Sequence, residues 1–365
     1  MTITAIAFLV LGVVLLVLGA EFLVRGASRL SAMFSVSPLV IGLTIVAFGT
    51  SAPELAVSLH STLADKADIA IGNVVGSNIC NVLLILGASA LVSPLIVAQQ
   101  LIRLDVPIMI GVSWLVLLFG WDQTINPTDG IVLFVGGVVY TLFLLYQSRK
   151  ESDQNVQDEY AQEYGPQPFS WKKVGVYALL ILVGLVALVI GSQLLVDSAE
   201  TIATALGASR LVVGLTVVAI GTSLPELATS LVASFRGERD IAVGNVVGSN
   251  IFNILVVLGL TSALSPVGVE ISAAALTFDI PVMVAVAVLC FPIFFSGNLI
   301  SRWEGGLLLG YYLVYVLYLI LKTADHDSSE TFGAILGFAV LPLTVLGLLV
   351  MTWRSRSARR HKPEN

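Results

Sequence analysis

Apolar residues occur along this chain in blocks, each close to the length that a helix needs to cross a membrane. A membrane-spanning helix requires roughly 20 consecutive, mainly apolar residues. Eleven blocks approach this length, and most polar residues lie between them. The pattern therefore predicts an all-α polytopic membrane protein. Its spans are expected near residues 4–28, 39–63, 69–91, 104–120, 129–146, 174–203, 211–235, 241–264, 277–295, 303–321 and 332–352.

One long polar segment, residues 147–173, separates the fifth predicted span from the sixth. It is too short for a domain of its own, and we interpret it as a solvated linker, with a short interfacial helix as the alternative. The apolar start of the chain lacks a basic leading region, so it is expected to be the first span and not a cleaved signal peptide.

The second and third predicted spans recur later in the chain. Residues 39–83 align with residues 211–255 at a constant offset of 172, and 29 of the 45 aligned positions are identical. Two apolar helices would not match this closely by chance. Both copies also place Gly-Thr-Ser, a proline and a glutamate inside an apolar run, at 49–54 and at 221–226. Ionisable groups at membrane depth are energetically costly, and they favour an ion or substrate pathway.

The repeat extends over five spans in each half. Ser93-Pro94 matches Ser265-Pro266, and the segment that starts at Asp105 matches the one that starts at Asp279. An aspartate followed by a proline is typical of a helix start, so both aspartates are expected to be N-caps at the membrane surface. The predicted organisation is a first repeat at 1–146, a cytoplasmic linker at 147–173, a second repeat at 174–322, and an additional span with a basic tail at 323–365.

The distribution of Lys and Arg predicts the orientation, because cytoplasmic loops carry an excess of these residues. With the N-terminus outside and the C-terminus cytoplasmic, the outer segments hold only Lys66, Arg210 and Lys322. An odd number of spans in each half then gives the second copy the opposite orientation, which is typical of secondary transporters. The inner segments hold Arg25, Arg29, Arg103, Arg149, Lys150, Lys172, Lys173, Arg236, Arg239, Arg302, Arg354, Arg356, Arg359, Arg360 and Lys362.

The composition agrees with a membrane protein: 57% of the residues are hydrophobic and 12% are charged, against about 25% charged in soluble domains. The net charge of −6 adds little, and no basic patch indicates a nucleic-acid partner. Cys80 and Cys290 lie in apolar runs without a metal-binding or disulfide spacing. We interpret them as small packing residues.

The repeated motif offers oxygen ligands at helical spacing. Thr50 and Glu54 are four residues apart and share a helix face, as do Ser77 and Asn81 on the next span. The second copy repeats this with Thr222 and Glu226, and with Ser249 and Asn253. Each proline frees the carbonyl four residues before it, at Gly49 and Gly221. Oxygen ligands suit Na⁺, Ca²⁺ and Mg²⁺, whereas the absence of a His or Cys pair from the motif disfavours zinc and copper.

Other residues of the motif have a packing interpretation. The pairs Gly72/Gly76 and Gly244/Gly248 have the GxxxG spacing of close helix contacts. They are expected to join span two to three and span seven to eight. The alternative for the two glutamates is a pair of protonated acids that bridge helices. The remaining asparagines are expected to form hydrogen bonds between helices, with an ion-binding role as the alternative, at Asn73, Asn78, Asn245 and Asn250.

Together, GTSxPE and GNxxGSN, each present twice at a fixed separation, resemble the cation/Ca²⁺ exchanger superfamily, and in particular the prokaryotic Na⁺/Ca²⁺ exchangers. The resemblance covers both repeats and implies a ten-helix core of two inverted five-helix repeats, to which this chain adds one span. It implies a Ca²⁺ position formed by Glu54, Glu226, Thr50 and Thr222. It also implies one Na⁺ position formed by the Ala47 carbonyl, Thr50, Ser51, Glu54 and Ser249. A matching position is formed by the Ala219 carbonyl, Thr222, Ser223, Glu226 and Ser77, and a central position is bordered by Asn81 and Asn253.

Several members of the superfamily, including K⁺-dependent ones, have an aspartate where this chain has Asn253. The sequence therefore predicts a site with two carboxylates and K⁺-independent transport. The expected function is electrogenic Na⁺/Ca²⁺ antiport by alternating access, with Ca²⁺ extruded across the cell (inner) membrane. The expected partners are Ca²⁺, Na⁺ and the lipid bilayer, with no obligate protein partner evident and no prosthetic group. H⁺/Ca²⁺ antiport is the alternative, followed by a cation channel. An enzyme is disfavoured, because the sequence contains no HExxH motif and the serines of the motif have no base as a partner.

Overall fold

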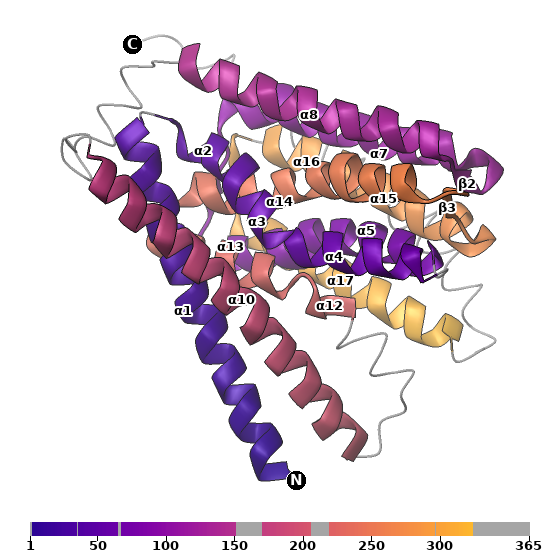
Figure 1. Ribbon diagram of the computed structural model, residues 1–365, viewed down its shortest axis with the longest axis horizontal. Helices are drawn as coiled ribbons and strands as arrows, with labels where there is room; N and C mark the ends of the chain where they lie inside the picture. The colour runs from indigo at the N-terminus through magenta and orange to yellow at the C-terminus, as the bar shows by residue number, and fades with distance from the viewer. Residues whose placement is uncertain are drawn as a thin grey trace.

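The computed structural model describes residues 2–34, 36–64, 67–150, 170–205, 219–295 and 297–323. Within these ranges the chain is almost entirely helical (Figure 1). The eleventh predicted span and most of the predicted linker lie outside the described residues, as do residues 211–218 of the seventh predicted span.

Within the described part of the chain, eight helical segments are long and apolar enough to cross a membrane, and a bent pair of helices makes a ninth. Each of the nine overlaps one predicted span and differs from it by a few residues at its ends. The prediction of a polytopic helical membrane protein is thereby confirmed. The eight unbroken segments are Thr4–Phe34, Ile69–Val92, Leu101–Asp122, Pro127–Gln147, Trp171–Ala205, Arg239–Leu264, Ala275–Phe295 and Arg302–Lys322.

The elements follow one another in the same order in the two halves of the chain. The first half contains α1 (Thr2–Phe34), α2 (Pro38–Ile41), η1 (Gly42–Val46), α3 (Ala47–Thr50), α4 (Ala52–Leu63), α5 (Ala67–Cys80), η2 (Asn81–Leu86), α6 (Gly87–Val92), β1 (Leu95–Ile96), η3 (Leu101–Asp105), α7 (Val106–Phe119), η4 (Gly120–Asp122), β2 (Thr124–Ile125) and α8 (Pro127–Lys150).

The second half contains α10 (Trp171–Ala205), α12 (Ala219–Gly221), α13 (Leu224–Arg236), α14 (Arg239–Phe252), η6 (Asn253–Leu258), α15 (Gly259–Leu264), β3 (Val269–Glu270), η7 (Ala275–Asp279), α16 (Ile280–Phe295), β4 (Leu299–Ile300) and α17 (Arg302–Thr323).

The bent pair is the span that carries the first Gly-Thr-Ser-Ala-Pro-Glu motif. Pro38–Thr50 and Ala52–Leu63 meet at 43°, with Ser51 at the break. Pro53 lies in the first turn of α4, where a proline is tolerated because its missing N–H would have no helical partner. The second copy breaks in the same way, between α12 and α13, at Thr222 and Ser223. The proline in each motif therefore starts a new helix, and the glutamate lies in its first turn.

The spans that follow the breaks contain a wide helical turn that the sequence did not reveal. The π-helical segments η2 and η6 begin at Asn81 and Asn253, which are matched positions of the repeat. Segments of this type are frequent at functional sites, because the extra residue in the turn re-aims side chains and carbonyls.

The helices α1 and α10 cross each other along one side of the bundle (Figure 1). Their contact is made by glycines: a Cβ on Gly19 would lie 2.8 Å from the carbonyl oxygen of Gly184, and one on Gly12 would lie 2.8 Å from that of Gly191. The two backbones therefore pack directly on each other. Most residues of α5, η2, α14 and η6 are buried, whereas most residues of α1 and α10 are not.

Two short antiparallel ladders join loops of the first half to loops of the second half. Leu95 and Ile96 of β1 pair with Ile300 and Leu299 of β4. In the other ladder, Thr124 and Ile125 of β2 pair with Glu270 and Val269 of β3 (Figure 1). These strands of two residues were not predicted, because they are too short for an alternating pattern.

The prediction that Asp105 and Asp279 cap helices at the membrane surface is wrong. Asp105 is fully buried, and the helical turns of η3 lead into α7 without a break. Its Oδ1 accepts a hydrogen bond of 2.8 Å from the Tyr140 hydroxyl on α8. Asp279, at the end of η7, accepts one of 3.2 Å from the Tyr315 hydroxyl on α17. Each aspartate therefore joins two helices.

The predicted partners of the second GxxxG pair are also wrong. A Cβ on Gly244 would lie 3.0 Å from the carbonyl oxygen of Leu39, and one on Gly248 would lie 2.8 Å from Cα of Leu43. These two glycines of the eighth span therefore face the second span, across the two halves. The residues that match Leu39 and Leu43 in the second copy, Leu211 and Leu215, lie outside the described ranges.

Candidate functional site

Two carboxylates form the centre of the candidate site. Glu54 is in the first turn of α4 and Glu226 in the first turn of α13, and neither side chain is exposed. The Ser51 hydroxyl donates to Oε1 of Glu226 at 3.0 Å, and the Ser223 hydroxyl donates to Oε1 of Glu54 at 3.3 Å. Each half thus supplies a hydroxyl to the carboxylate of the other half. Ser77 adds a longer contact of 3.5 Å to Glu54.

Several buried oxygens of the site accept or donate no hydrogen bond within the described part of the chain. Buried polar groups in folded proteins are nearly always paired, and an unpaired one costs about 1–3 kcal/mol. A cluster of unpaired acceptors at one place is therefore a candidate for cation binding. The oxygens concerned are Glu54 Oε2, Glu226 Oε2, Asn81 Oδ1, Asn253 Oδ1 and Ser249 Oγ.

The two threonines of the motif contact asparagines of the opposite half. Thr50 Oγ1 lies 3.1 Å from Oδ1 of Asn245, and Thr222 Oγ1 lies 3.2 Å from Oδ1 of Asn73. Asn73 donates to the backbone carbonyl of Glu54 at 3.1 Å, and Asn245 donates to that of Glu226 at 3.4 Å. Each asparagine therefore ties the threonine of one half to the glutamate of the other, as the predicted hydrogen bonding between helices requires.

The carbonyl groups near the breaks have different partners in the two copies. Ser51 donates its backbone N–H to the Ala47 carbonyl at 3.0 Å, whereas Ser223 donates to the carbonyl of Ile220 and not to that of Ala219. The Gly221 carbonyl accepts a hydrogen bond of 2.6 Å from the Ser192 hydroxyl on α10. The proline-freed carbonyl of the second copy is thus already occupied by a serine that sequence reasoning missed.

Four asparagines connect the two central spans, α5–η2 and α14–η6. Asn81 donates to Oδ1 of Asn250 at 3.0 Å, and Asn253 donates to Oδ1 of Asn78 at 3.1 Å. Asn78 also donates to the backbone carbonyl of Asn250 at 3.2 Å. The hydrogen bonds use the amide nitrogens of Asn81 and Asn253, so their amide oxygens remain for a ligand.

Most of the predicted site residues are connected by hydrogen bonds, either directly to one another or through Asn73 and Asn245. Ser249 is buried, with its hydroxyl unpaired within the described residues. Sequence reasoning missed the role of Asn73 and Asn245 beside the threonines, although both lie in the repeated GNxxGSN text. It also missed Ser192, which has no matching hydroxyl in the first half, where residue 20 is alanine.

Buried carboxylate, amide and hydroxyl oxygens lie together between broken helices, and oxygens of these types are the ligands that hard cations such as Na⁺ and Ca²⁺ prefer. The fold and the site together define an ion transporter of the membrane. The model of the family described as sodium/calcium exchanger protein matches residues 4–148 and 176–321.

Individual relatives agree with the family match. The sodium/calcium exchanger MaX1 of Methanosarcina acetivorans is 33% identical over 341 residues, which cover 85% of this chain and 97% of that protein. The inner membrane protein YrbG of Escherichia coli (strain K12) is 38% identical over 285 residues, with 78% and 87% covered. A solved structure of the sodium-calcium exchanger NCX_Mj superposes with a TM-score of 0.74 at 32% identity, with 87% and 100% covered.

The chain belongs to the sodium/calcium exchanger family. The prediction of this family from the two repeated motifs is thereby confirmed. The protein is an exchanger of the Ca²⁺ antiporter class, and the ions that such exchangers move are substrates and not resident cofactors.

Proposed function

We propose that the protein exchanges Na⁺ for Ca²⁺ across the cell (inner) membrane by alternating access and moves Ca²⁺ outward. The observation that carries this proposal is the group of buried, unpaired oxygens around Glu54 and Glu226. Two carboxylates balance the charge of one Ca²⁺, and the surrounding hydroxyls and carbonyls are ligands that Na⁺ also accepts.

The proposed organisation is a core of ten helices in two inverted repeats, at residues 1–146 and 174–322, with an added span and basic tail at 323–365. The matched hydrogen bonds support this arrangement, because Ser51 and Ser223, and likewise Asn73 and Asn245, make equivalent contacts to the opposite half. In an inverted-repeat transporter the substrate site lies between the repeats, which is where these contacts meet.

Each cation position is assigned to residues whose oxygens lie at this junction. Ca²⁺ is bound by the two glutamates and the two threonines, Thr50 and Thr222. One Na⁺ position uses Ala47, Ser51 and Ser249, and the open hydroxyl of Ser249 supports it. The other uses Ala219, Ser223 and Ser77. The free amide oxygens of Asn81 and Asn253 border the central position.

Transport is proposed to be electrogenic and independent of K⁺. The site contains two carboxylates, and Asn253 stands where K⁺-dependent relatives have an acid. If more charge enters as Na⁺ than leaves as Ca²⁺, the membrane potential drives the exchange by about 2.3 kcal/mol per elementary charge per 100 mV.

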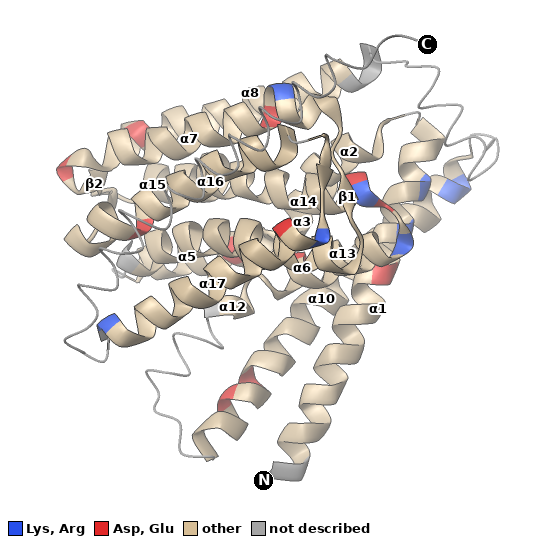
Figure 2. Cartoon of the chain, turned by 180° about the vertical axis from the view of Figure 1, so that it is seen from behind, with Lys and Arg blue, Asp and Glu red and all other residues tan. Residues whose placement is uncertain are grey.

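The N-terminus is proposed to face outward, with the 147–173 linker and the C-terminus in the cytoplasm. Most of the blue segments in Figure 2 gather where α1 and α13 end, while another marks the far end of α17. This uneven distribution supports the orientation, because cytoplasmic ends of spans are rich in Lys and Arg.

The test is Ca²⁺ uptake into proteoliposomes that are loaded with Na⁺ and then diluted into Na⁺-free medium, with K⁺ and its ionophore used to set the voltage. Uptake that needs internal Na⁺ and rises with an inside-positive potential is the expected result. Uptake that does not depend on Na⁺ but requires an outward proton gradient would instead establish H⁺/Ca²⁺ antiport at the same site. Saturation with Ca²⁺ and a requirement for a counter-ion separate both from a channel.

A further inference from the structure

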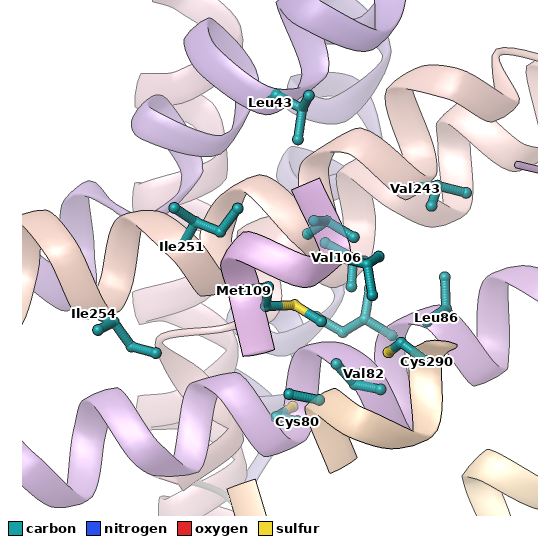
Figure 3. Packing of buried hydrophobic residues seen from close by; sticks show 14 of the residues in the cluster. Leu43, Cys80, Val82, Leu86, Val106, Met109, Val243, Ile251, Ile254 and Cys290 are labelled. Atoms are coloured by element: carbon teal, nitrogen blue, oxygen red, sulfur yellow. The ribbon is translucent and has the colours of Figure 1, made fainter. Parts of the chain in front are cut away.

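Two methionines outside the repeated 39–83 motif contact the asparagines of the candidate site. Met109 on α7 and Met283 on α16 hold matched positions, four residues after Asp105 and Asp279, and both are buried. Sδ of Met109 lies 3.5 Å from Nδ2 of Asn250, and Sδ of Met283 lies 3.7 Å from Nδ2 of Asn78. Figure 3 shows Met109 extending into the buried cluster, with its sulfur among apolar side chains.

A thioether sulfur accepts a hydrogen bond but cannot donate one, so it constrains which way a neighbouring amide faces. Because Asn250 directs its Nδ2 to Met109, its Oδ1 faces Asn81, and it accepts the hydrogen bond from the Asn81 amide nitrogen. The Asn81 amide nitrogen is then occupied, and its oxygen is left free.

The same chain of contacts occurs in the other half. Asn78 directs its Nδ2 to Met283, its Oδ1 accepts from the amide nitrogen of Asn253, and Oδ1 of Asn253 is left free. Each series of contacts runs from a methionine through one asparagine to a second asparagine, whose amide oxygen in the candidate site is unpaired within the described residues.

We propose that Met109 and Met283 are positioning residues that set the orientation of the Asn81 and Asn253 amides, so that oxygens and not N–H groups face the transported cation. This inference rests on the proposed function, in which these two oxygens border the central position. An amide N–H turned toward a cation would repel it, whereas an amide oxygen is a good ligand for Ca²⁺ or Na⁺.

The two chains of contacts differ in one respect that sharpens the proposal. Nδ2 of Asn78 also donates to the backbone carbonyl of Asn250 at 3.2 Å, so a second acceptor holds it in place. For Nδ2 of Asn250, the described residues provide the Met109 sulfur as acceptor. Met109 is therefore expected to matter more than Met283, although the two residues are matched in the sequence.

The test compares Met109→Leu and Met283→Leu in the full-length protein. Leucine preserves most of the volume but accepts no hydrogen bond. The initial rate of Ca²⁺ uptake is measured against the Ca²⁺ concentration. Met109→Leu is expected to raise KM for Ca²⁺ about three- to tenfold, the size of effect that one lost hydrogen bond produces, with little change in the maximal rate. Met283→Leu is expected to change KM less than about twofold, because the Asn250 carbonyl still holds Asn78.

Met33→Leu on α1 is the control, since it removes a buried thioether that is on another span. A double-mutant cycle provides the second measurement. In an Asn81→Ala background, Met109→Leu should have no further effect on KM, whereas Met283→Leu should keep its own small effect. A purely space-filling role would make Met109→Leu resemble Met33→Leu, or would make its effect additive with Asn81→Ala, and either result would overturn the proposal.

All variants are compared only as folded protein, which a single symmetrical peak in size-exclusion chromatography establishes. Should Met109→Leu fail this check, Met109→Ile takes its place in the same cycle. KM for Ca²⁺ is measured whichever ion drives the exchange. A failure of Na⁺ coupling would therefore leave the test intact and is a separate result from a failure of this proposal.

Discussion

The two copies of the Gly-Thr-Ser-x-Pro-Glu motif share their key residues but have different surroundings. A Cβ on Gly49 would lie 2.6 Å from Leu185, and one on Gly221 would lie 2.6 Å from Val196, and both of these neighbours are on α10. A strictly symmetric molecule would place α1 beside one copy and α10 beside the other. Instead α10 touches both, and its Ser192 occupies the Gly221 carbonyl.

A second difference concerns charge. Glu21 on α1 forms ion pairs with Arg25 on the same helix and with Arg236 at the end of α13. The matched positions in the other copy are Gln193, Asp197 and Ala64, which cannot reproduce the pair between helices. The two copies therefore share the residues of the candidate ion site, whereas the ion pair of Glu21 with Arg236 and the Ser192 hydrogen bond occur on one side only.

The largest expected effect comes from the residues that the copies share. Glu54→Gln and Glu226→Gln should each reduce Ca²⁺ transport by more than about 100-fold, since loss of outer-shell partners alone costs 10- to 100-fold at a metal site. The measurement is Ca²⁺ uptake into proteoliposomes at equal protein content, with Glu238→Gln, at the start of α14, as the control. Transport that survives in both glutamate variants would contradict the site assignment.

An intermediate effect is expected where the copies differ by one hydroxyl. Ser192→Ala removes the hydrogen bond to Gly221 and should lower the free energy of unfolding by about 1 kcal/mol. Thermal unfolding in detergent measures it. The matched control, Ala20→Ser, adds a hydroxyl at the equivalent position of α1, and it should give no comparable gain. If the two substitutions changed the free energy of unfolding by equal and opposite amounts, the Gly49 and Gly221 carbonyls would have equivalent surroundings.

The smallest effect is expected at the one-sided ion pair. The Arg236 side chain is 49% exposed and that of Glu21 is 16% exposed, so screening by solvent limits the pair to less than about 1 kcal/mol. Glu21→Gln should lower the unfolding temperature slightly in dilute buffer, and the difference should fade in concentrated choline chloride. A shift that is unchanged by salt would point to packing of the side chain and not to its charge.

The sequence predicted most spans and the two central glutamates because these signals are local or repeated. A block of apolar residues predicts a span without knowledge of its neighbours. Two copies of the Gly-Thr-Ser-x-Pro-Glu motif at a fixed offset indicate that Glu54 and Glu226 belong together, although 172 residues separate them.

The failures all concern partners that are distant in the chain. An aspartate followed by a proline resembles a helix cap in the sequence. The sequence does not show that a hydroxyl on the next span, here that of Tyr140, donates a hydrogen bond to it. The glycines of a GxxxG pair show that a helix comes close, but they do not identify it, and for Gly244 it was the second span. The π-helical turns at Asn81 and Asn253 have no local signal, because they arise where packing shifts a helix by one residue.

Each half of the chain supplies a serine to the carboxylate of the other half, and this arrangement has a consequence for how such a protein could have arisen. Ser51 serves the carboxylate of the second half, and Ser223 serves that of the first. In a single copy of the repeat, the glutamate would therefore lack the serine that the other half supplies. An ancestor with one copy would have needed a second chain to supply that serine. Duplication and fusion of the gene would place both serines in one chain.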